Sequence, residues 1–221
     1  MSDLDVLVPD DRIDDAIKIL KANGYTDDGL AYDRTMRHAP ALWRSGELTA
    51  IELHTAASSS LALNVLPPGE LFQNAISGND PALTAPAPVD RICHLVSHAQ
   101  IDSGRYASNL VLLRDVADYA RMSAKFGKDE ILEASNRFDQ AGLLQYFQSF
   151  IELSCHVLEV RNPIDQTNDE AGNWAQTTLD LTAKPGRHRL AMLATIFAWM
   201  WERLSSGPAA RRQFLSGLFS P

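Results

Sequence analysis

The sequence lacks the short motifs that mark several common enzyme classes. Among its 221 residues there is no G-x-x-x-x-G-K-[ST] phosphate-binding loop and no G-x-G-x-x-G dinucleotide fingerprint. No Ser-His-Asp pattern of a hydrolase is present either. These absences leave P-loop NTPase, Rossmann dehydrogenase and serine hydrolase interpretations without support.

Cysteine is scarce, and so are long hydrophobic runs. The two cysteines, Cys93 and Cys155, lie inside apolar helical patterns, which predicts buried free thiols rather than a disulfide. The most apolar stretch, residues 190–201, is too short to span a bilayer and has charged neighbours at both ends. The N-terminus is acidic and lacks the basic region of a signal peptide. We therefore expect a cytoplasmic protein without a membrane partner.

Basic residues are few in the first part of the chain. Residues 1–90 contain 14 Asp and Glu against 6 Lys and Arg, whereas residues 91–221 contain 14 of each, for a net charge of −8. Nucleic-acid binding requires a basic surface, so this distribution argues against it. An acidic first part suits the binding of metal ions.

The composition is that of a globular protein, with 45% hydrophobic and 22% charged residues. Glycine, asparagine, aspartate and three prolines accumulate in residues 77–88, which favours a domain boundary there. Strand patterns precede this segment and helical patterns follow it. We predict an α+β fold, in which a small mixed-sheet domain (1–87) is followed by an all-helical domain (88–221).

The first domain is predicted to run β-α-β-β-β over its first 56 residues. The expected elements are strands at 2–8, 25–32, 36–44 and 48–55, a helix from 10 or 11 to 23, and a hairpin turn at 45–47. A short helix is expected at 70–76. Further helices are expected near 88–102, 106–126, 128–139, 141–160, 169–181, 187–205 and 208–218.

Two carboxylates share one face of the first predicted strand. Asp3 and Asp5 alternate with Leu4 and Val6, so their side chains lie about 7 Å apart on the same side. They repel each other, and a cation between them would relieve the repulsion. Mg²⁺ prefers such oxygen ligands and keeps positions open for phosphate oxygens. The alternative is an edge strand with a solvated acidic face.

A second predicted strand presents another acid and an imidazole. Glu52 and His54 lie on one face of residues 48–55, while Ile51 and Leu53 lie on the other. If this strand neighbours the first one in a sheet, then Asp3, Asp5 and Glu52 can converge. Because all three acids lie on one face of their strands, we predict that they converge on one edge of a single sheet.

These strands form part of a longer ordered series of motifs. In order along the chain stand Ser2–Val8 (S-D-L-D-V-L-V), Leu20–Tyr25 (L-K-A-N-G-Y), His38 and Ile51–His54 (I-E-L-H). The series resembles a bacterial nucleotidyltransferase-like family of the DNA polymerase β type superfamily. Downstream, residues 94–99 and 113–117 resemble the helical half of that family. The resemblance covers most of residues 1–120.

The resemblance implies a metal-dependent transfer of a nucleoside monophosphate from an NTP to a hydroxyl-bearing acceptor, which is a small molecule or a protein. It implies Mg²⁺ or Mn²⁺ held by Asp3, Asp5 and Glu52, with Glu52 also the catalytic base nearest the acceptor. The implied active site lies in a cleft between the two domains. Its expected substrate contacts are His54, His38, Arg34, Arg37, Arg44 and His98. His94 and His98 also share one helix face, which allows a two-histidine metal site or simple packing.

One family element is missing from the sequence. The superfamily places a Gly-Ser or Gly-Gly turn upstream of the first carboxylate strand, where it cradles phosphates, but here Asp3 is the third residue. We expect either a longer natural product or a shortened relative. The second case implies a catalytically inactive binding or accessory subunit. An unpaired edge on the first strand would also favour a homodimer through that region or aggregation.

Overall fold

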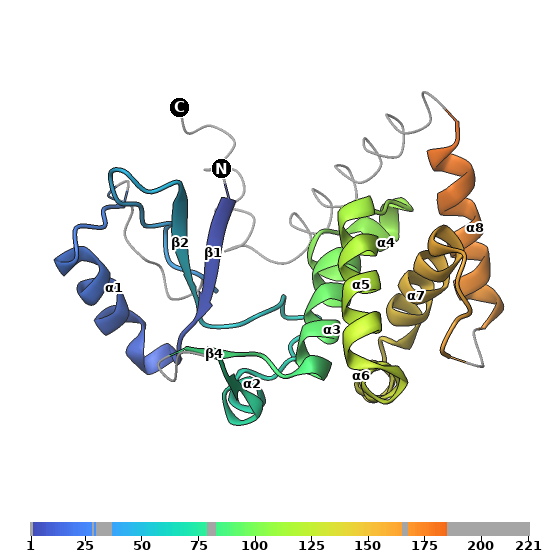
Figure 1. Ribbon diagram of the computed structural model, residues 1–221, viewed down its shortest axis with the longest axis horizontal. Helices are drawn as coiled ribbons and strands as arrows, with labels where there is room; N and C mark the ends of the chain where they lie inside the picture. The colour runs from blue at the N-terminus through green and yellow to red at the C-terminus, as the bar shows by residue number, and fades with distance from the viewer. Residues whose placement is uncertain (1, 28, 30–36, 79–82, 165–167, 185–221) are drawn as a thin grey trace, which may run out of the picture. The chain divides into compact units, whose positions relative to one another are not determined.

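A small sheet followed by a series of helices gives the chain the predicted α+β class (Figure 1). The computed structural model describes residues 2–27, 29, 37–78, 83–164 and 168–184. The chain divides into two compact units, Met1–Ala87 and Pro88–Pro221. The helices predicted at 187–205 and 208–218 lie outside the described residues.

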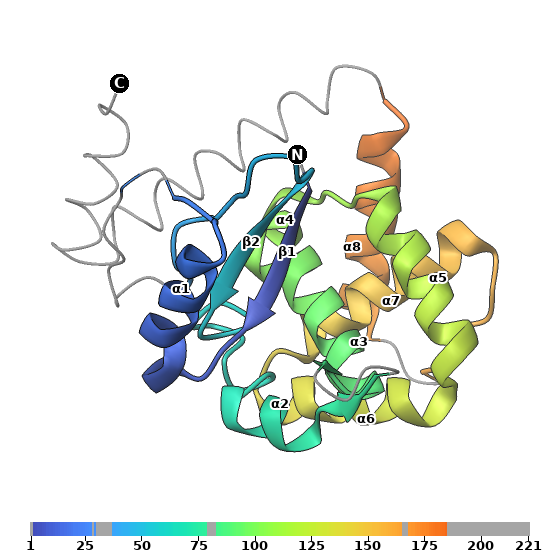
Figure 2. The ribbon, with the colours of Figure 1, turned by 60° about the vertical axis from the view of Figure 1, so that its left-hand side comes forward.

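The first unit is built on a parallel strand pair. Strand β1 (Ser2–Leu7) pairs with β2 (Thr49–His54), and both strands run in the same direction (Figure 2). A parallel pair needs a long connection, and here the connection contains the short helix η1 (Asp10–Arg12) and α1 (Ile13–Ala22). The predicted first strand, first helix and Glu52 strand are therefore all present.

The second edge of β2 is lined by residues 37–43. The backbone N–H of Ala39 donates to the Leu53 carbonyl (2.8 Å) and that of Leu42 to the Ile51 carbonyl (2.9 Å). Between these two hydrogen bonds, residues 39–42 advance by three positions while β2 advances by two. The extra residue forms a bulge around Pro40. Proline has no N–H to donate, and this explains why the strand predicted at 36–44 is reduced to isolated bridges.

The strand predicted at 25–32 is likewise represented by a single bridge, between Thr26 and Trp43, among its described residues. The hairpin turn predicted at 45–47 is present. Gly46 has φ +89°, a left-handed conformation that suits glycine, and the Glu47 N–H donates to the Arg44 carbonyl at 3.1 Å. The turn brings β2 back along residues 37–43.

Helix α1 covers one face of the parallel pair. Ile13, Leu42 and Leu53 are buried together with Ala39, and Val6, Ile17 and Leu20 pack against them. The residues that alternate with Val6 and Leu53 consequently project from the opposite face of the sheet. The unit continues with α2 (Pro68–Asn74) and an antiparallel pair formed by β3 (Ile76–Ser77) and β4 (Thr84–Ala85).

Helices are the only regular secondary structure among the described residues of the second unit. Its elements are α3 (Pro88–Val96), a π-helical segment η2 (Ser97–Asp102), α4 (Arg105–Ser108), α5 (Leu113–Phe126), α6 (Lys128–Gln140), α7 (Leu144–Leu158) and α8 (Asp169–Thr182). The single helix predicted over 106–126 is interrupted, because Asn109 adopts a left-handed conformation with φ +50°. Across the described ranges, no helix combines the length and apolar character that a membrane span requires.

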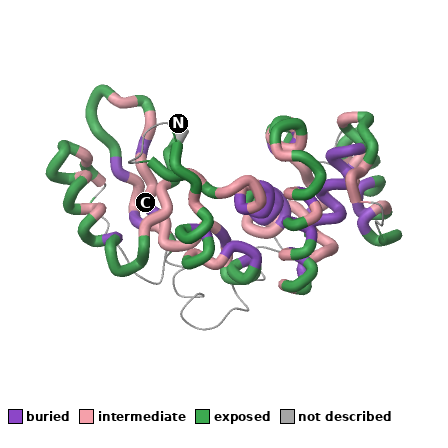
Figure 3. Tube along the Cα trace, turned by 60° about the horizontal axis from the view of Figure 1, so that its bottom comes forward, coloured by how far each residue is buried: buried purple, intermediate pink, exposed green. Residues whose placement is uncertain are grey.

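The core of the second unit is centred on α7, which contacts α3, α5, α6 and α8. Phe147 and Phe150 of α7 are fully buried, and so is Phe138 of α6. Figure 3 marks the buried positions of the chain in purple. Cys93 and Cys155 are buried free thiols, as the sequence predicted.

Two ion pairs are enclosed in this helical unit. The buried Asp90 carboxylate accepts a hydrogen bond from Arg137 Nη1 at 2.6 Å. The buried Asp115 carboxylate accepts one from Arg105. The neighbouring Arg114 is largely exposed, with its Nε 3.6 Å from Asp115 Oδ1. Arg105 is the partly buried partner that Asp115 requires.

Candidate metal centre

The register of the parallel pair decides which polar side chains meet. Asp5 lies directly beside Glu52, and His54 follows two residues further along β2. Neighbouring residues on adjacent strands point to the same side of a sheet. All three side chains therefore project from the face opposite α1.

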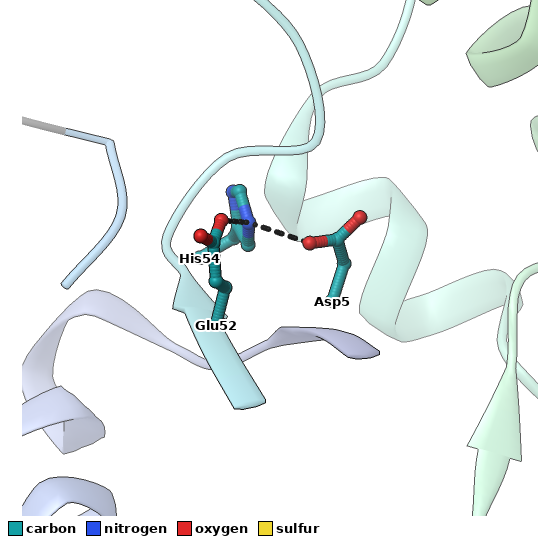
Figure 4. Close-up of side chains that lie close together, drawn as sticks. All are labelled: Asp5, Glu52 and His54. Carbon is teal, nitrogen blue, oxygen red and sulfur yellow. Dashed lines mark hydrogen bonds and ion pairs between the residues drawn. The ribbon is translucent and has the colours of Figure 1, made fainter. Parts of the chain in front are cut away.

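The three side chains approach one another closely. His54 Nε2 lies 3.0 Å from Asp5 Oδ1 and 3.5 Å from Glu52 Oε2. One nitrogen or oxygen ligand atom from each residue lies within 4.8 Å of the other two. Figure 4 shows the imidazole linked to both carboxylates.

The environment of the group is partly open to solvent. The side chain of Asp5 is 63% exposed, whereas those of Glu52 and His54 are 25% and 23% exposed. The imidazole contacts both acids, which would otherwise repel each other across the strand pair. A small ligand can reach the group from the Asp5 side, while β2 supplies the more enclosed side.

His38 packs against the imidazole of His54. Their ring centroids are 5.3 Å apart with a 36° angle between the ring planes, and the two residues form an antiparallel bridge. His38 Nδ1 lies 3.2 Å from the carbonyl oxygen of Ala39. His38 is therefore a neighbour of the group through His54.

Asp3 occupies the same sheet face but lies outside the group. Its partner on β2 is Ala50, and its side chain is exposed. Within the part of the chain that the structure describes, Asp5, Glu52 and His54 form the one set of at least three close metal-ligand side chains. The parallel register therefore brings His54 to the two acids, rather than Asp3.

The described arginines of the first unit have other surroundings. Alternation along residues 37–39 assigns Arg37 to the face of buried Ala39, opposite His38, and its carbonyl accepts hydrogen bonds from Thr55. The guanidinium of Arg44 pairs with Glu47 and lies 4.8 Å from the centre of the Tyr25 ring. Arg34 falls outside the described residues.

The Glu47 carboxylate connects Arg44 to Tyr25. The Tyr25 hydroxyl donates to Glu47 Oε2 at 2.6 Å, and this hydrogen bond together with the Arg44 pair lowers the pKa of Glu47. The same hydrogen bond raises the pKa of Tyr25. These contacts fix Arg44 beside the hairpin turn.

His98 belongs to the second unit. It is exposed on η2, and its ring centroid is 6.1 Å from that of His94. This pair has the spacing of one helix face, as predicted, and is not accompanied by a third close metal-ligand side chain among the residues searched.

From the sequence, His54 was predicted to be a substrate contact and not a metal ligand. The available signal was its i, i+2 spacing from Glu52, which puts both on one strand face. What the sequence did not supply was the register that aligns Asp5 with Glu52.

The donor set is chemically suited to a divalent cation. Two carboxylates supply hard oxygen ligands and charge, and an imidazole supplies a nitrogen ligand. The separations of 3.0 and 3.5 Å from His54 Nε2 are short enough for ligands of one ion.

The chain belongs to a family described as uncharacterised nucleotidyltransferases, whose family model matches residues 1–159. The matched segment contains β1, β2 and all three residues of the candidate centre, and it extends through α7. Comparisons with curated proteins and with solved structures gave no match.

Proposed function

We propose that this protein transfers a nucleoside monophosphate from an NTP to a hydroxyl-bearing acceptor, with Mg²⁺ or Mn²⁺ as cofactor. The observation that carries the proposal is the convergence of Asp5, Glu52 and His54 in a chain of a nucleotidyltransferase family. Neither observation alone gives a reaction, because acidic clusters are common and family membership does not guarantee an intact site. Together they supply a reaction class and the residues to perform it.

Asp5 and Glu52 are proposed to hold the metal ion by their carboxylate oxygens. A bound divalent ion neutralises the charge of the triphosphate and of the leaving pyrophosphate. Asp3, on the same sheet face two residues before Asp5, is proposed to contribute to a second ion position. His38 is proposed to hold the His54 ring in place and to face the substrate.

Glu52 is proposed to accept the proton of the acceptor hydroxyl. The acceptor oxygen then forms a bond to the α-phosphorus while the bond from that phosphorus to the bridging oxygen of the β-phosphate breaks. Pyrophosphate leaves, and the acceptor carries the nucleoside monophosphate. The more enclosed position of Glu52, 25% exposed against 63% for Asp5, suits the residue that must hold a proton away from bulk water.

A catalytically inactive binding or accessory role is the second candidate. The observation that favours it is the position of the described arginines. Arg44 pairs with Glu47, and Arg37 is assigned to the opposite sheet face, so the triphosphate contacts expected of them require a rearrangement.

The two roles are separated by measuring binding and turnover on the same preparation. The full chain is titrated with ATP, CTP, GTP and UTP in the presence of Mn²⁺ or Mg²⁺, by calorimetry. Pyrophosphate release is then measured with a panel of hydroxyl-bearing small molecules and proteins. A transferase binds at least one nucleotide, releases pyrophosphate when its acceptor is present, and loses both properties in Asp5→Asn.

Nucleotide binding without pyrophosphate release across the acceptor panel would favour the accessory role. No binding of any nucleotide at millimolar concentration would contradict the transferase role and would likewise favour the accessory role. The matched control is Asp15→Asn, which removes an exposed carboxylate of α1 whose partners are Arg12 and Lys18.

A further inference from the structure

We infer that His54 is a metal ligand and that it makes the centre select Mn²⁺ over Mg²⁺. This inference deepens the proposed function, since it concerns the metal identity of the same centre. It begins from a difference between the sequence-based expectation and the structure. The expected ligand set was three carboxylates, whereas the structure groups two carboxylates with an imidazole.

The distances support His54 as a ligand. In six-coordinate geometry with bonds of roughly 2.1 Å, adjacent ligand atoms lie on the order of 3 Å apart. His54 Nε2 lies 3.0 Å from Asp5 Oδ1 and 3.5 Å from Glu52 Oε2. The nitrogen is thus placed beside both carboxylates at the separation of neighbouring ligands.

The position of the imidazole is determined by the fold. His54 is the last residue of β2, and its carbonyl accepts a hydrogen bond from the Val8 N–H at 2.8 Å, just beyond the end of β1. Its ring packs at a 5.3 Å centroid distance against His38, on the other neighbouring segment. The hydrogen bond fixes the His54 backbone, and the packing against His38 limits the positions open to the His54 ring.

The chemistry of the donor set then determines which of the two metal ions the centre prefers. Carboxylate, carbonyl and water oxygens suit both Mg²⁺ and Mn²⁺, whereas an imidazole nitrogen is a softer donor that transition-metal ions accept more readily than Mg²⁺ does. Mn²⁺ accepts both kinds of donor, so a set of two carboxylates and one imidazole favours Mn²⁺ over Mg²⁺. A third carboxylate in place of His54 would reduce this difference.

The test uses the full chain and Mn²⁺ alone, without nucleotide. Free Mn²⁺ is measured by its electron paramagnetic resonance signal at constant pH, and Mg²⁺ is added as a competitor. In the wild type we expect about tenfold or greater preference for Mn²⁺. His54→Asn should weaken Mn²⁺ binding by at least about tenfold, with a smaller change for Mg²⁺.

A second substitution separates the loss of a ligand from a change of its type. His54→Asp restores a carboxylate, and we expect it to lower the ratio of Mn²⁺ to Mg²⁺ affinity by about tenfold while Mg²⁺ binding is retained. Asp15→Asn serves as the control, since it removes a carboxylate outside the centre. Unchanged Mn²⁺ affinity in both His54 variants would overturn the inference.

The wild-type protein supplies an independent measurement if the variants do not fold. Pulsed electron paramagnetic resonance of bound Mn²⁺ detects ¹⁴N of a coordinated imidazole, and we expect this coupling in the wild type. Bound Mn²⁺ without ¹⁴N coupling, or no bound Mn²⁺ at all, would also overturn the inference. Since no nucleotide is present, the result is independent of whether the chain catalyses transfer.

Discussion

The two units differ in how far their key carboxylates are exposed to solvent. In the first unit, Asp5, Glu52 and His54 stand together on a partly open sheet face. In the second unit, Asp90 and Asp115 are fully or almost fully buried, and each is paired with an arginine. The same residue types are thus left open to a ligand in one unit and enclosed in the other.

This difference separates residues that hold the fold from residues available for chemistry. A buried carboxylate is tolerated only with a partner, and removal of that partner leaves a charge in an apolar interior. A partly exposed carboxylate remains hydrated, so its removal costs the fold little. We therefore expect substitutions at the buried ion pairs of the second unit to lower the free energy of unfolding. Substitutions at the candidate centre of the first unit should lower ligand binding with little loss of stability.

The largest effect is expected at the Asp90–Arg137 pair. Arg137→Met removes the partner of a fully buried carboxylate, whose Oδ1 accepts from Arg137 Nη1 at 2.6 Å. We expect the free energy of unfolding to fall by about 3–5 kcal/mol. Urea unfolding followed by circular dichroism at 222 nm measures the loss, because the second unit is helical.

The matched control for this experiment is Arg121→Met. Its guanidinium lies 2.7 Å from Asp118 in an ion pair of similar length, but the Arg121 side chain is 78% exposed. Exposed pairs contribute about 0–1 kcal/mol. Equal losses in the two variants would show that burial does not distinguish the pairs.

A smaller effect is expected from alkaline pH through Cys93. Burial raises the pKa of the Cys93 thiol from its usual 9.0 to about 12. Above pH 9 the unfolded chain loses this proton while the folded chain keeps it, so the free energy of unfolding falls as pH rises toward 12. Below pH 9 the thiol is protonated in both states and its contribution to stability is fully present.

The measurement compares wild type with Cys93→Ala between pH 8 and pH 11. We expect the wild type to lose about 2 kcal/mol more stability than the variant over this interval. Burial also raises the pKa of Tyr119 and Cys155, but both remain in the two proteins and cancel in the comparison. Parallel pH profiles would contradict the role of Cys93.

The fold class and the two key strands were predictable because their signals are local. The β-branched and leucine residues of β1 and β2, interrupted by Pro9 and a hairpin turn, identify strands, and alternation identifies the faces. The helical unit was predictable from its apolar periodicity. Cys93 and Cys155 lie within those helical patterns and are buried.

The composition of the centre was not predictable because it depends on register. Alternation places Asp3, Asp5, Glu52 and His54 on consistent faces but leaves open which residues stand side by side. The parallel pairing sets Asp5 beside Glu52 and Asp3 beside Ala50. Backbone exceptions were missed for a similar reason, as at Pro40 and Asn109, where one residue interrupts an otherwise regular pattern.

The smallest change in stability is expected at the candidate centre itself. Asp5→Asn removes one of two neighbouring negative charges, which relieves repulsion with Glu52, and weakens the 3.0 Å contact with His54 Nε2. The Asp5 side chain is 63% exposed, so both effects are screened by water and should leave the free energy of unfolding within about 0.5 kcal/mol of wild type. The same variant should lose most of the Mn²⁺-dependent rise in melting temperature, because that rise requires a ligand of the native state. Thermal unfolding with and without millimolar Mn²⁺ measures both quantities in one experiment. A large loss of stability without metal would place Asp5 with the enclosed pairs of the second unit and would contradict the division of roles between the two units.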